Sequence, residues 1–76
     1  GQAGDRLLRL DPVARFAVPL GGQEIELQTL AFETGGPEFL RVRIREGRRF
    51  TVFDIDAATA RDWSAAMARW AAERGA

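Results

Sequence analysis

Arginines and aromatic rings at alternating positions are the side chains of this sequence whose types and spacing could do chemistry. Arg41 and Arg43 stand two residues apart, Arg49 follows, and Phe53 lies in the next apolar run. Because alternate residues of a strand share a face, these groups can line one surface of a sheet. On such a surface a guanidinium group pairs with phosphate and a ring stacks on a base. The pattern is typical of single-stranded nucleic-acid binding.

The carboxylates give little sign of catalysis. Asp54 and Asp56 flank Ile55, and we interpret them as a turn acid and the N-cap of a helix. Glu24 and Glu26 share a face, but nothing in the pattern suggests the burial that raises a catalytic pKa. The sequence has no Cys, no His and no Lys, and its one Ser lies in a predicted helix with no base beside it. We therefore expect a protein that is not an enzyme and holds no cofactor and no metal.

Composition favours one small globular domain. The chain has 76 residues, is 46% hydrophobic and 29% charged, and carries a net charge of +0. The neutral balance argues against a purely electrostatic grip on nucleic acid or on an anionic membrane. No apolar run approaches the length of a membrane span and no signal peptide is visible, so we expect a cytoplasmic protein without membrane contact.

Three turn signals predict the elements that must position these residues. They are Gly21-Gly22, residues 35–38 and residues 45–47, and each joins two runs of alternating apolar pattern. The predicted class is α+β: a four-stranded antiparallel β-meander with one C-terminal α-helix packed on one face. Residues 1–12 are expected to form an N-terminal arm with a frayed start, and residues 13–76 the single ββββα domain.

The turns also predict how the strands pair. Val18 should lie opposite Ile25, Ala31 opposite Val42, and Val42 opposite Phe50. One face is then apolar, and the helix should cover it with a stripe of Trp63, Met67 and Trp70 at i, i+4 and i+7. The apolar face would consist of Phe16, Val18, Ile25, Leu27, Ala31, Leu40, Val42, Ile44, Phe50 and Val52.

The opposite face should carry the function. In this register it holds the basic stripe of Arg41, Arg43 and Arg49, with Glu24 and Glu26 close enough to pair with arginines. It also holds an apolar cluster of Leu30, Phe32, Phe39 and Phe53. A contiguous apolar patch is uncommon on a monomer, so we expect this cluster to be a homodimer interface. An ordered N-terminal arm carrying Leu7, Leu8 and Leu10 could cover it instead.

The element order and the Trp63 position resemble the PC4-like family of single-stranded-DNA-binding coactivators. The similarity extends from about Arg15 to Trp70 and lies in topology and patterning. It implies a dimer that binds the strand through a curved sheet, with contacts from Arg41, Arg43, Arg49 and Phe53. The absence of Lys and the presence of Glu24 and Glu26 depart from that family. The Arg- and Ala-rich composition also resembles short proteobacterial families without an assigned activity.

Overall fold

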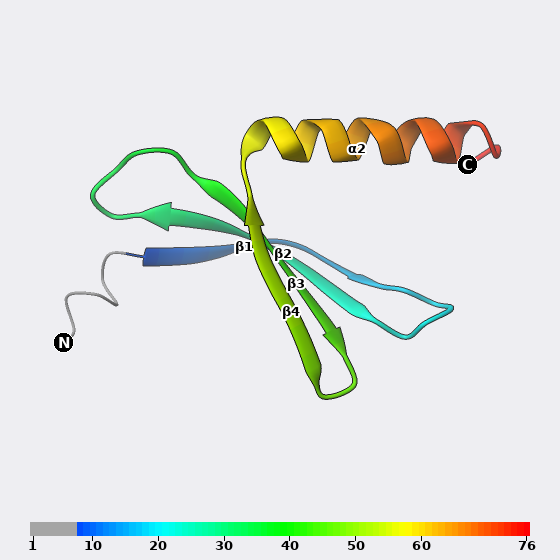
Figure 1. Cartoon of the computed structure of the whole chain (residues 1–76), viewed down its shortest axis with the longest axis horizontal. Coiled ribbons are helices and arrows are strands. Elements are labelled where there is room, and N and C mark those ends of the chain that lie inside the picture. Colours follow the sequence, from blue (N-terminus) through cyan, green and yellow to red (C-terminus); the bar gives the residue numbers. More distant parts are fainter. Residues whose placement is uncertain (1–7) are drawn as a thin grey trace.

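The structure is a computed structural model that describes residues 8–76, and it has the predicted α+β architecture. Four antiparallel strands form one open sheet in the order β1-β2-β3-β4, and one helix follows (Figure 1). The strands are β1 (Leu8–Ala17), β2 (Glu24–Phe32), β3 (Phe39–Glu46) and β4 (Arg49–Ile55), and the helix is α2 (Ala57–Ala72).

The first strand begins earlier than predicted. Leu8 lies opposite Phe32 and Leu10 opposite Leu30, so residues 8–12 belong to the sheet and the predicted arm over residues 1–12 is too long. Asp11-Pro12 does not end the strand, because β1 is an edge strand, where a residue without an N–H is tolerated, and because the register shifts beside Pro12. Residues 1–7, with the Leu7 of the predicted arm, lie outside the described residues.

The first two hairpins are in shifted registers that leave the predicted faces unchanged. Ile25 lies opposite Phe16, two residues from the predicted Val18, and Val42 lies opposite Leu27, four residues from the predicted Ala31. Both connections are longer than predicted: Val18 pairs with Gln23 across residues 19–22, and residues 33–38 join β2 to β3. A shift by an even number keeps each side chain on its face.

The third hairpin is in a different register, and this shift reverses the faces of β4. Val42 lies opposite Phe53, three residues from the predicted Phe50. The loop is Gly47-Arg48, closed by the pair Glu46–Arg49, and Gly47 has a φ of 62°. A two-residue loop with its only positive φ at the first position is the type II′ turn, which matches strand twist better than the predicted bulged turn.

The two faces of the sheet therefore differ from the prediction in β4. The face toward α2, here the helix-side face, includes Phe16, Ile25, Leu27, Leu40, Val42, Ile44, Phe53 and Ile55. The other, here the ion-pair face, includes Arg15, Glu24, Glu26, Arg41, Arg43, Arg45, Phe50, Val52 and Asp54, and at its far end Leu8, Leu10, Leu30, Phe32 and Phe39. Phe50 and Val52 thus lie on the ion-pair face, and Arg49 and Phe53 do not.

Both predicted ends of the helix are confirmed. The Asp56 carboxylate accepts a hydrogen bond of 3.2 Å from the backbone N–H of Thr59, which makes Asp56 the N-cap. At the other end Gly75 has a φ of 82°, and the N–H of Ala76 donates to the carbonyl of Ala71. This is the Schellman arrangement, in which a glycine in the left-handed region ends the helix.

The helix does not cover the sheet as predicted. It leaves the end of β4 and runs away from the strands (Figure 1), and its contacts with the sheet centre on β3 and on the Phe53–Trp63 ring pair at 5.8 Å. Trp63, Met67 and Trp70 remain 45%, 63% and 61% exposed. Among residues 8–76 the buried side chains are only Leu30, Ala31 and Val42. Asp56 is the single residue between β4 and α2, and the chain turns sharply there from the strand into the helix (Figure 1).

Candidate functional site

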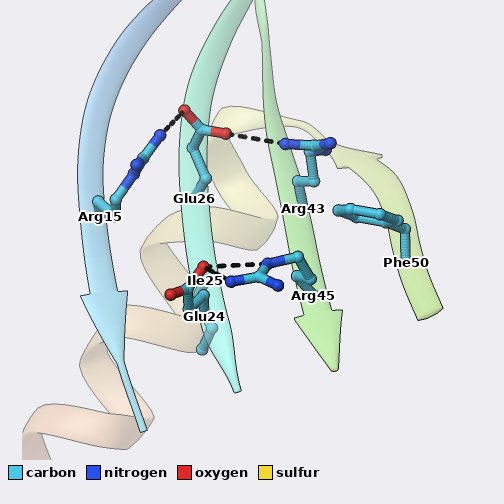
Figure 2. A pocket seen from close by; sticks show the side chains of 7 residues that line it. All are labelled: Arg15, Glu24, Ile25, Glu26, Arg43, Arg45 and Phe50. Carbon is cyan, nitrogen blue, oxygen red and sulfur yellow. Dashed lines mark hydrogen bonds and ion pairs between the residues drawn. The ribbon is translucent and has the colours of Figure 1, made fainter. Parts of the chain in front are cut away.

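Ion pairs across three strands dominate the ion-pair face. Glu26 of β2 accepts from Arg15 of β1 at 3.0 Å and from Arg43 of β3 at 3.4 Å, and Glu24 accepts from Arg45 at 3.1 Å (Figure 2). These residues meet because directly opposite partners share a face, as in the pairs Arg15–Glu26 and Glu26–Arg43. The expected pairing of the glutamates with arginines is confirmed, so this face is a compensated ladder of charges.

The pair between Arg41 and Asp54 has the most specific geometry on this face. Arg41 Nε donates to Asp54 Oδ1 at 2.8 Å and Nη2 donates to Oδ2 at 3.2 Å. This fork-like contact lowers the pKa of the Asp54 carboxyl and raises the pKa of Arg41, each through its hydrogen bond to the other. Asp54 is thus a strand residue with an ion-pair partner, and its assignment as a turn acid was wrong.

A shallow hollow lies over the ladder next to an aromatic ring. Its volume is about 260 Å³, and the Arg43 guanidinium lies 4.4 Å from the Phe50 ring centroid (Figure 2). The hydrogen bond from Arg15 lowers the pKa of Glu26, and that from Arg45 lowers the pKa of Glu24. These carboxylates are therefore held ionised, whereas a general acid near neutral pH needs a raised pKa.

The predicted nucleic-acid contacts are divided between the two faces. Arg41 and Arg43 lie on the ion-pair face, but Arg49 lies opposite Glu46 and Phe53 opposite Val42, both on the helix-side face. The residues that take their places are Arg45 and Phe50. Sequence reasoning missed them because it placed the β3–β4 turn one residue early and made it a bulge. The glycine after Glu46, at the first position of a two-residue loop, was the available signal.

The predicted apolar interface is divided in the same way. Leu30 is only 5% exposed, between Leu10 and Phe39 on the neighbouring strands, and the Phe32 and Phe39 rings meet edge to face at 6.5 Å. Phe53 is on the other side of the sheet, against Trp63. Leu8 and Leu10 of β1 lie beside the remaining cluster of Leu30, Phe32 and Phe39. The start of β1 thus occupies part of the place that a partner was expected to fill.

Comparison with known proteins places the chain in a family. The sequence model of a family of unknown function, DUF6967, matches residues 8–73. The chain belongs to the DUF6967 family. The match begins at the first residue of β1 and ends just beyond α2, so it covers the whole ββββα unit. No curated protein and no solved structure matches the chain. The family agrees with the expected resemblance to a short family without assigned activity and adds no support for the PC4-like resemblance.

One open apolar surface in the described part of this DUF6967 chain was not predicted. It is the stripe of Trp63, Met67 and Trp70 on α2, here the helix stripe, together with Phe16 on the sheet, which is 52% exposed. The Arg74 guanidinium lies 4.1 Å from the Trp70 ring centroid and borders the stripe. The sequence pattern identified the stripe correctly, but nothing in the pattern could show that the sheet of the same chain leaves it uncovered.

Neither a group of metal-ligating carboxylates nor a membrane-spanning helix is present in residues 8–76 of the DUF6967 chain. No three Asp or Glu side chains in that range are grouped closely enough to hold a metal ion, and the sequence has no His and no Cys. The one described helix, α2, is too short and too polar to cross a membrane.

Proposed function

We propose that this DUF6967 protein is a non-catalytic interaction domain that works as a homo-oligomer. The observation that carries the proposal is the open helix stripe, in which two tryptophans and a methionine on one side of α2 are about half exposed or more. Contiguous apolar surface of this kind marks an interaction site on a soluble protein. Burying such a side chain contributes about 1.5–3 kcal/mol to the free energy of folding or association, which is a large contribution for a small domain.

The size of the exposed surface supports a partner. A compact monomer of 8.4 kDa exposes about 4,600 Å², whereas this chain exposes 6063 Å². Its radius of gyration is 15.0 Å, against about 11 Å for a compact chain of this length. The excess area is larger than the ~800 Å² that each partner gives to a standard protein interface. An oligomer would remove this excess without any change in the strands.

The chemistry of the open surfaces supports a role without catalysis. Glu24, Glu26 and Asp54 each have an arginine partner and a lowered pKa. Such groups are poor proton donors near neutral pH, because the ionised form is the stabilised one. The proposal therefore assigns the ion-pair face to holding the strands in register rather than to a reaction.

Sedimentation equilibrium on matched variants tests the oligomer. The wild type should sediment at a multiple of 8.4 kDa at micromolar concentration. Met67→Glu should shift it toward the monomer, because a charge would be buried in the contact. Ala65→Glu adds the same group on the opposite side of the helix and should leave the assembly unchanged. A wild type that sediments as a monomer at every concentration would contradict the proposal.

A second candidate, single-stranded nucleic-acid binding, is favoured by the stacking of Arg43 on Phe50. The ring is half exposed beside the hollow, and such a pair could accept a base and a phosphate. The acidic partners of Arg15, Arg43 and Arg45 oppose it, because they neutralise the charge that a phosphate would need. Fluorescence anisotropy with a labelled oligonucleotide at low salt tests it. A signal that falls with salt and with Phe50→Ala would favour this function over the first.

A further inference from the structure

We infer that two copies of the chain exchange their helices, so that the helix stripe of each packs on the helix-side face of the other. The inference rests on the proposed function, because it requires a homo-oligomer, and it names the surfaces that meet. The partner is a second copy of this chain, and the contact is made twice around a two-fold axis.

The helix-side face of the sheet has an open apolar row that suits the stripe. Phe16, Ile25 and Ile44 lie directly opposite one another on β1, β2 and β3. All three point to the helix-side face, yet Phe16 is 52% exposed and the other two are only partly buried. The row is uncharged across three strands, so its desolvation by tryptophan and methionine side chains leaves no buried ion unpaired.

The helix of the same chain leaves much of this row open, since Phe16 is 52% exposed. Asp56 is the only residue between β4 and α2, and its carboxylate is bonded to the N–H of Thr59. The contacts of α2 with its own sheet centre on β3, with Trp63 near its start against Phe53. Figure 2 shows α2 behind the strands, on the side away from the ion pairs, and Figure 1 shows it diverging from them. Met67 and Trp70 therefore remain largely exposed on their own chain, at 63% and 61%.

Exchange of helices differs from simple pairing of two helices in the surfaces that it covers. A contact between two α2 helices would cover Trp63, Met67 and Trp70 but would leave the row of Phe16, Ile25 and Ile44 in water. Exchange covers both surfaces with one kind of contact, which is made twice around the two-fold axis. It also accounts for an excess of exposed area greater than one standard interface requires from each partner.

Cross-linking with engineered cysteines tests the inference, because the chain has no native Cys. Met67→Cys and Phe16→Cys are prepared separately, mixed under conditions that allow exchange of subunits, and treated with a short bis-maleimide. The expected product is the mixed species that joins position 67 of one chain to position 16 of the other. Ala65→Cys, on the opposite side of α2, should give several-fold less of it. Circular dichroism confirms that each variant remains folded.

The outcomes separate the exchange from the proposed function. A dimer that cross-links through two copies of Met67→Cys, without the mixed product, would overturn the exchange and leave the homo-oligomer standing. A wild type that is monomeric would overturn both. A measurement without substitutions completes the test: in a mixture of isotope-labelled and unlabelled wild type, filtered NMR should detect contacts between the Trp70 indole and the Phe16 ring across chains. Contacts found only within one chain would contradict the exchange.

Discussion

Val42 lies directly opposite Phe53, and this pairing determines which face every residue of β4 occupies. It places Phe53 and Ile55 beside the start of α2, and it places Phe50 over the arginine ladder of the ion-pair face. The two-residue turn at Gly47 sets the pairing. One glycine therefore controls both the apolar contacts below the helix and the aromatic residue at the hollow.

Gly47→Val should destabilise the domain through backbone strain. Gly47 has a φ of 62°, which a β-branched residue rarely adopts, while an added Cβ would have nothing within 4 Å. The expected loss in the free energy of unfolding is about 1–3 kcal/mol. Urea denaturation measures it, and Gly47→Asn is the control, because Asn tolerates the left-handed region better. Equal losses for Val and Asn would contradict an origin in backbone strain.

Arg41 and Asp54 should be energetically coupled. Their forked contact, with bonds of 2.8 and 3.2 Å, lies on a part of the sheet where both side chains are about two-thirds or more covered. A double-mutant cycle with Arg41→Met and Asp54→Asn should give a coupling of about 0.5–1 kcal/mol. The pair Arg74–Glu73, at 3.5 Å and largely exposed, serves as a comparison and should show less. A coupling energy of zero for Arg41 and Asp54 would show that the forked contact does not contribute to stability.

Stability should fall in acid. The folded-state pKa values of Glu24, Glu26 and Asp54 lie below the ordinary values of 4.5 and 3.8, because each carboxylate accepts hydrogen bonds from arginine. A lowered pKa means that the folded state prefers the ionised form more than the unfolded state does. The stabilisation is therefore complete above the ordinary value and is lost as the pH falls through the lowered one. Melting temperatures between pH 7 and 2 check this, and Glu26→Gln should flatten the profile.

The sequence could predict most of the fold, because an error in register by an even number of residues leaves each side chain on its predicted face. The pairing errors at Ile25 and Val42 moved residues by two and four positions along a neighbouring strand and changed no face. The error at Phe53 was three positions, and it moved Phe50, Val52, Arg49 and Phe53 to the wrong sides. Local signals such as the Asp56 cap and Gly75 were sufficient at the helix ends.

The site was less predictable, because it depends on where the helix lies and not on which residues form it. The spacing of Trp63, Met67 and Trp70 correctly indicates one apolar stripe. The same spacing is compatible with packing on the sheet of its own chain or of another, since an amphipathic helix buries its stripe in either case. The exposure of the stripe depends on where α2 lies after the junction at Asp56, and the spacing of apolar residues carries no information about that position.

Trp70→Ala should alter the concentration dependence of stability more than the stability of one chain. Within its own chain Trp70 is 61% exposed and its ring contact is with Arg74, so truncation removes little. In an oligomer the same ring would be covered by the partner. Because only folded chains can assemble, mass action makes the melting temperature rise with protein concentration. The wild type should show this rise between micromolar and millimolar concentration, and Trp70→Ala should show a smaller one. Trp63→Ala should in addition lower the melting temperature at the lowest concentration, because it removes the contact with Phe53 in the same chain. A wild-type melting temperature that is independent of concentration would contradict the role assigned to Trp70.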